Sequence, residues 1–206
     1  MSVVSDERAA LAQTFREAGP DAPTLCGGWQ TRDLLAHLVV RESRPDAAPG
    51  ILVPFLAGYT ERVQNSYARG DYAGLVGRFA SGPPLWSPFR LVEGLANTAE
   101  FFVHHEDVRR GSTGWEPRTL PTGLHSALTS TLKRMGKPLL RSVPARLTLV
   151  DPAGGEVLTT GSGPAVTITG DIGELMLFAF GRDAVRVEFT GSDSAVESVR
   201  GASRGL

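Results

Sequence analysis

The sequence has a single cysteine, no long apolar run and no excess of either charge. Its single cysteine, Cys26, excludes an internal disulfide and cannot build a thiolate zinc site by itself, so histidine and carboxylate must hold any metal. The 21 basic and 22 acidic residues give a net charge of -1 without blocks of either sign, which predicts no nucleic-acid or membrane-surface partner. No apolar run reaches the roughly 18 residues that a membrane-spanning helix needs.

The start of the sequence and its size set two further expectations. Residues 1–7 carry neither the basic region nor the apolar stretch of a signal peptide, so we expect a cytoplasmic protein. The chain has 206 residues, of which 41% are hydrophobic. That is enough for one large domain or two small ones with a packed core.

The larger, N-terminal part of the chain has the pattern of helices. Capping residues, breaks at glycine and proline, and apolar residues spaced by three and four all contribute to this prediction. The predicted helices are 5–19, 31–43, 55–69 with an extension at 72–79, 88–110 and 120–135. We expect Ser5 and Thr31 to cap the first two, and Leu11 and Phe15 to mark the inner face of the first.

Composition changes near Pro138, where apolar residues begin to alternate as they do in strands. Strands are expected at 145–150, 156–160, 165–169 and 185–189, and helices at 172–180 and 192–199. The sequence therefore predicts an α+β fold with a helical domain at 1–138 and a small α+β domain at 139–206. The second domain contains neither cysteine nor histidine, so metal chemistry should belong to the first.

Two histidines and a glutamate are candidate metal ligands. Glu100 and His104 are four residues apart in an apolar helix, about one turn, so both side chains leave the same face. A partner is expected, because an unpaired carboxylate in apolar surroundings is costly. His37, in another apolar helix, would complete a three-ligand site with a position open for water or substrate. Alternatively, His37 is a hydrogen-bonded core residue, and Glu100 and His104 simply bond to each other.

Two charged neighbours of these residues each have two interpretations. Asp107, three residues beyond His104, could accept the ring N–H and fix its tautomer, or pair with Arg110 or Arg41. Arg41 lies one turn beyond the first histidine and could bind a substrate carboxylate in bidentate fashion. It could instead pair with Asp107 or Glu42.

Three other polar residues, His105, Glu106 and Cys26, are not expected to bind the metal or the substrate. His105 points about 100° away from its neighbour and is expected at the surface or behind the ligands, and Glu106 in solvent. Cys26 precedes a helix N-terminus, which favours a thiolate. We nevertheless reject a role as nucleophile for it, because no base is identifiable beside it.

Three stretches, residues 24–38, 100–107 and 169–182, carry a longer pattern. Together they resemble the mycothiol-dependent maleylpyruvate isomerase family, within the DinB-like superfamily of metal-binding four-helix bundles. The middle stretch looks like the family's E-x-x-x-H-x-x-D signature, and the last looks like its C-terminal domain. The family pattern has a small residue or cysteine at the position of Cys26, which implies that this residue packs near Trp29. Residues 39–46 are similar to an actinobacterial branch of the family rather than to the isomerase itself.

The resemblance implies an N-terminal DinB-like four-helix bundle, joined to a small C-terminal α+β domain, with His37, Glu100 and His104 as metal ligands. It also implies that the region of Arg182 helps to bind thiol or substrate, although a charge at a helix C-terminus is the simpler explanation. Zinc is the expected metal, but iron, nickel and manganese suit the same ligands.

The function implied by the resemblance is that of a transferase or isomerase. Its co-substrate would be a low-molecular-weight thiol, mycothiol, and its substrate a small electrophile. Two alternatives from other classes stay open: a metal-binding sensor or binding module without catalysis, and a hydrolase that uses metal-bound water.

Overall fold

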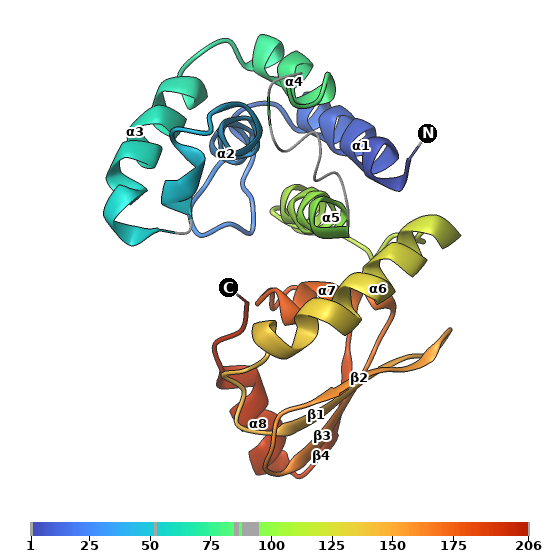
Figure 1. The fold of residues 1–206 in the computed structure, drawn as a ribbon. Coiled ribbons are helices and arrows are strands. Elements are labelled where there is room, and N and C mark those ends of the chain that lie inside the picture. Colours follow the sequence, from blue (N-terminus) through green and yellow to red (C-terminus); the bar gives the residue numbers. More distant parts are fainter. Residues whose placement is uncertain (1, 52, 85–86, 88–94, 206) are drawn as a thin grey trace. The chain divides into compact units, whose positions relative to one another are not determined.

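A computed structural model of the protein describes residues 2–51, 53–84, 87 and 95–205. The chain forms two compact units, Met1–Trp115 and Glu116–Leu206. Helices build the first unit, whereas the second combines helices with a four-stranded sheet (Figure 1). The predicted α+β fold, helical in its N-terminal part and with strands in its C-terminal part, is confirmed.

The first unit contains five labelled helices in its described residues. They are α1 (Val3–Ala18), α2 (Thr31–Ser43), α3 (Ala57–Ala68), α4 (Tyr72–Ala80) and α5 (Leu95–Arg109), with short 3₁₀ turns at Ala48–Ile51 and Pro54–Leu56 between α2 and α3. The predicted extension at 72–79 is a separate helix, because Asp71 caps it by accepting a hydrogen bond from the Ala73 N–H at 3.1 Å. The expected start of α5 near residue 88 lies outside the described residues.

The caps of α1 and α2 differ from the prediction. Ser2, not Ser5, caps α1, since its hydroxyl oxygen accepts a hydrogen bond from the Ser5 N–H at 3.2 Å. At α2 the capping residue is Gln30, whose N–H donates to Asp33 Oδ2 at 2.9 Å. Thr31 is already inside that helix. Both helices therefore begin slightly earlier than the most obvious capping residue indicates.

The core of the first unit fixes the positions of α2 and α5. Leu11 and Phe15, predicted on the inner face of α1, are fully buried. Phe79 makes edge-to-face contacts with Phe15 and Phe101 at centroid distances of 6.0 and 5.6 Å. Burying side chains of this size stabilises a fold by about 1.5–3 kcal/mol each. Because α1 packs on α5, and α2 packs on α3 and α4, the two helices with candidate ligands are held in place.

The second unit is a mixed sheet with helices packed on it. Its elements are α6 (Thr122–Leu139), β1 (Arg146–Asp151), β2 (Gly155–Thr160), β3 (Ala165–Thr169), α7 (Ile172–Ala179), β4 (Glu188–Gly191) and α8 (Asp193–Gly201). The strand order is β2-β1-β3-β4, in which β1 and β3 are parallel and the outer pairs are antiparallel. Helix α6 packs on α7 and β2, and α8 packs on β3 and β4.

The units divide at residues 115 and 116, whereas composition changes near Pro138. Helix α6 accounts for the difference, since it buries Leu128 and Leu132 within the second unit. Gly136 lets the helix approach the sheet closely: a Cβ built there would lie 2.4 Å from a methyl carbon of Leu158 in β2. A change from helical to alternating pattern marks a change of element, and here α6 belongs with the strands that follow it.

None of the described helices is long and apolar enough to span a membrane.

Candidate metal centre

The two candidate histidines and the candidate glutamate come together between α2 and α5. Glu100 Oε1 lies 3.4 Å from His104 Nε2 and 3.8 Å from His37 Nε2. One ligand atom from each of the three residues lies within 4.8 Å of the other two, which is close enough for one ion to reach all three. The two imidazole rings have centroids 5.6 Å apart and are steeply inclined, at 72°. Their predicted proximity is therefore present in the structure.

The far nitrogen of each ring has a partner of its own. His104 Nδ1 lies 2.9 Å from Asp107 Oδ2, which is the first of the two contacts that the sequence allows for Asp107. His37 Nδ1 lies 3.0 Å from Nε2 of the Gln64 side-chain amide in α3. Metal-binding histidines commonly use their second nitrogen in this way, which fixes the tautomer and leaves the first nitrogen for the ion. The sequence pattern did not predict Gln64, because nothing in the spacing of α3 points to His37.

The side chains of the centre carry opposite charges by themselves. Burial alone would raise the pKa of Glu100, but hydrogen bonds from His104 and His37 hold that pKa well below its usual range. Burial would lower the pKa of His104, yet its hydrogen bonds to Asp107, Cys26 and Glu100 raise it well above the ordinary value. For His37 burial dominates, and its pKa is lowered. These shifts favour an ionised Glu100 and a protonated His104, and a divalent ion would replace a proton of His104.

Arg41 also reaches the site. Its Nε lies 3.7 Å from Glu100 Oε1, and its Nη2 donates to Asn97 Oδ1 at 3.0 Å. The acidic partner of Arg41 is therefore the candidate ligand Glu100. Glu42 instead pairs with Arg8. Asn97 is almost completely buried and was not singled out in the sequence, although it lies three residues before Glu100 on α5. Binding of a substrate carboxylate by Arg41 stays a prediction.

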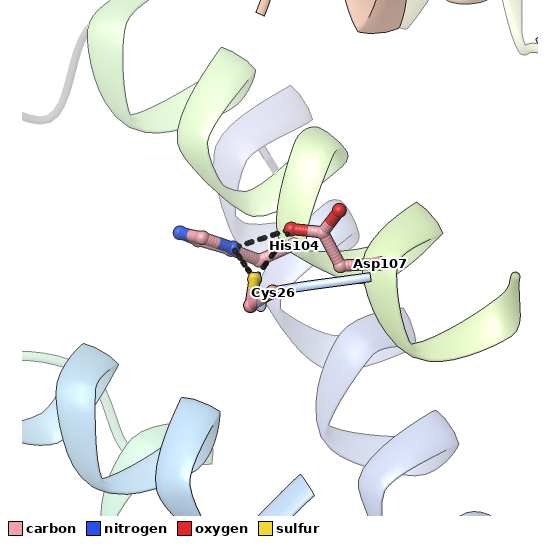
Figure 2. A group of neighbouring side chains, drawn as sticks. All are labelled: Cys26, His104 and Asp107. Atoms are coloured by element: carbon pink, nitrogen blue, oxygen red, sulfur yellow. Dashed lines mark hydrogen bonds and ion pairs between the residues drawn. The ribbon is translucent and has the colours of Figure 1, made fainter. Parts of the chain in front are cut away.

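Cys26 lies beside Nδ1 of the His104 ring, the nitrogen on the opposite side from Glu100. Figure 2 shows its sulfur next to Asp107, and the Sγ donates to Asp107 Oδ2 at 3.0 Å and lies 3.8 Å from His104 Nδ1. The interpretation that no base lies beside Cys26 is therefore wrong. Its packing role is present as well, because Cys26 and Trp29 both pack against the core of the first unit.

His105 and Glu106 are both buried, so the expectation of a solvent-exposed Glu106 is wrong, as is the surface alternative for His105. His105 Nδ1 lies 2.9 Å from Glu7 Oε1 in α1. Glu106 accepts hydrogen bonds from Arg109 and Arg110, each at 2.7 Å. Helix α5 is covered on nearly all sides, so positions that a one-sided pattern assigns to solvent carry buried, paired charges.

Arg182 belongs to the second unit. It follows α7, and its Nη1 donates to the Phe180 carbonyl oxygen at 2.8 Å. This contact with the end of its own helix agrees with the simpler of the two explanations. A contribution of Arg182 to thiol or substrate binding stays a prediction.

Comparison with known proteins bears on the helices that build this centre. Residues 3–47 match the family model of the mycothiol maleylpyruvate isomerase N-terminal domain. The similarity to that family model is confined to this segment. The segment contains α1 and α2, and with them His37 and Cys26, so the resemblance predicted from the sequence is confirmed.

A solved structure extends the likeness to the whole fold. The crystal structure of the mycothiol-dependent maleylpyruvate isomerase is similar, with a TM-score of 0.62 over 92% of this chain and 91% of that chain. Sequence identity is 13%, so this likeness concerns the fold. No curated protein matches the sequence.

Proposed function

We propose that the protein is a metal-dependent enzyme that uses a low-molecular-weight thiol, mycothiol, to transfer or isomerise a small electrophilic substrate. The observation that carries the proposal is the convergence of His37 Nε2, His104 Nε2 and Glu100 Oε1, with both remaining ring nitrogens engaged elsewhere. Such a site would have three protein ligands and an open position. That arrangement is typical of catalytic rather than structural metal centres.

The donor atoms suit zinc, which accepts two imidazole nitrogens and one carboxylate oxygen in catalytic sites. A bound ion would supply the positive charge that lowers the pKa of a coordinated thiol or water. Asp107 would hold the His104 ring by accepting its Nδ1–H, and Gln64, whose amide nitrogen lies 3.0 Å from His37 Nδ1, would hold the His37 ring by the same kind of contact. For Gln64 this requires that its amide present the oxygen, an assignment that side-chain amides leave open.

Charge and space beside the ligands support a small anionic or polar substrate. The Arg41 guanidinium lies against Glu100, where it would bind a carboxylate of the substrate or orient the ligand itself. A cavity of about 210 Å³ lies beside Trp29 and Gln64, the two residues that contact the His37 ring. Asp33, Asn65 and Ala68 also line this cavity. The ring of Trp29 lies 5.4 Å from the ring of His37 and covers one side of it. These groups would orient a thiol or substrate.

A thiol titration of the cobalt-substituted protein tests the proposal. A thiolate that coordinates the ion changes the visible ligand-field bands, so we expect mycothiol to shift the spectrum at micromolar to millimolar concentration. Glu100→Ala should abolish the shift by removing a ligand, and Glu197→Gln, which alters an exposed carboxylate in α8, should not. A cobalt spectrum unchanged by saturating thiol would contradict direct coordination. It would favour a hydrolase or a sensor instead.

A further inference from the structure

The loop before α2 holds Cys26 in a defined place. The Trp29 N–H donates to the Cys26 carbonyl oxygen at 2.7 Å, and Gly27 and Gly28 between them adopt φ angles of 27° and 83°, which favour glycine. The Leu25 N–H donates to the main-chain oxygen of Asp107 at 3.0 Å. The loop is therefore anchored to the last turns of α5, next to the candidate ligand His104.

Cys26 and His104 share one carboxylate oxygen. Asp107 Oδ2 lies 3.0 Å from Cys26 Sγ and 2.9 Å from His104 Nδ1, and the Asp107 side chain is completely buried (Figure 2). An ionised carboxylate is only an acceptor, so the thiol must act as a donor in this contact. Two donors on one oxygen restrict the rotation of the carboxylate about its χ angles more than either donor alone.

The sulfur is on the wrong side of the ring to join the three proposed ligands. His37 and Glu100 face His104 Nε2, whereas Cys26 faces Nδ1 at 3.8 Å. The two nitrogens of an imidazole point away from each other. An ion bound at Nε2 would therefore not reach the sulfur, which leaves Cys26 free to act through Asp107.

We propose that Cys26 is a positioning residue of the metal centre: its thiol fixes the Asp107 carboxylate that orients His104 and keeps the proton on Nδ1. This inference rests on the proposed function, because it assigns the thiol a role toward the proposed ligand. Carboxylates that orient a ligand histidine typically contribute about 10–100-fold to metal affinity. A thiol that orients the carboxylate is one contact farther away, and we expect about 3–10-fold.

Two substitutions separate the hydrogen bond from packing. Cys26→Ser keeps a donor toward Asp107, whereas Cys26→Val fills the place of the sulfur with methyl groups and has no donor. We expect Cys26→Val to weaken cobalt affinity by about 3–10-fold and to shift the ligand-field bands, while Cys26→Ser stays within about twofold of the unaltered protein. Thermal unfolding of each variant, followed by circular dichroism, shows whether it is folded at the temperature of the titration.

A second measurement does not depend on the metal. In the metal-free protein, the His104 Nδ1–H proton resonance should be retained in Cys26→Ser, and in Cys26→Val it should move or broaden through faster exchange. Val and Ser variants that match the unaltered protein in both affinity and resonance would overturn the inference, with the metal centre itself intact. A sulfur-to-cobalt charge-transfer band without added thiol, lost in Cys26→Ser, would also overturn it by making Cys26 a ligand. Absence of His104-dependent cobalt binding in the unaltered protein would instead overturn the proposed function.

Discussion

His104 uses both of its ring nitrogens, Nδ1 toward Asp107 and Nε2 toward Glu100. The carboxylate behind the ring should therefore matter to metal binding without touching the ion. We expect Asp107→Asn to weaken zinc affinity by about 10–100-fold, because an amide is a poorer acceptor for the ring N–H. Competition with a chromogenic chelator measures this. The exposed Glu197→Gln variant should bind as the unaltered protein does, and equal affinities for all three proteins would contradict the role of Asp107.

The raised pKa of His104 makes metal binding depend on pH. Below that pKa an incoming ion must displace one proton, so we expect affinity to rise by about tenfold per pH unit above the ordinary histidine value of 6.5 and to level off at higher pH. Calorimetric titrations in buffers of different ionisation enthalpy count the proton released. A pH-independent affinity across that range would show that His104 is neutral in the metal-free protein.

The shifted pKa values of His104 and Glu100 also predict how the stability of the metal-free protein depends on pH. The raised pKa of His104 contributes stability that is fully present below pH 6.5 and is lost as pH rises through the raised value. The depressed pKa of Glu100 contributes stability that is present above about pH 4.5 and is lost as pH falls through the depressed value. Thermal unfolding of the unaltered protein and His104→Gln should differ most between these limits. A constant difference at every pH would contradict the charge assignment.

At this scale the sequence predicted part of the site. A spacing of four on a helix was sufficient to place Glu100 and His104 on one face. The apolar residues around His37 indicated that its side chain is buried. The contact between Cys26 and Asp107 could not be predicted, because it joins a loop to a helix across 81 positions. The surface alternative for His105 was wrong because its partner, Glu7, is contributed by a different helix.

A buried ion pair joins helices α1 and α2 and helps to hold α2, which carries His37, in place. Arg8 Nη1 and Nη2 bond to Glu42 at 2.7 and 2.6 Å, and the guanidinium lies over the rings of Phe79 and Phe101 at 5.1 and 4.5 Å. The pairing brings together residues 34 positions apart, so helical periodicity alone did not reveal it. It fixes α2 about one turn beyond His37 and directly next to Arg41.

Removing one partner of this pair should be costly, because it leaves a buried charge uncompensated. We expect Glu42→Ala to lower the free energy of unfolding by about 3–5 kcal/mol. The double variant Arg8→Met/Glu42→Leu replaces both charges by apolar groups and should lose much less. Urea denaturation of the three proteins measures both effects. A Glu42→Ala variant as stable as the unaltered protein would show that the pair contributes little.

Across the whole molecule, the order of helices and strands followed from the sequence, but the place where the units divide did not. Composition marks the start of the strands, whereas contacts assign α6 to the second unit. We therefore expect residues 116–206 to fold cooperatively by themselves. Residues 139–206 should not, because they lose the apolar face of α6, with about 1.5–3 kcal/mol for each buried leucine. Circular dichroism melts of the two fragments decide, and equal cooperative transitions would support the boundary at 138 instead.

Metal content tests the central claim most directly, since all other inferences about the site depend on it. After identical loading with zinc and removal of excess, elemental analysis should find about one ion per chain in the unaltered protein. His37→Ala, Glu100→Ala and His104→Ala should retain almost none. His125→Ala is the matched control, because that histidine pairs with Asp151 in the second unit, and its occupancy should be unchanged. Equal zinc content in His104→Ala and the unaltered protein would contradict the account.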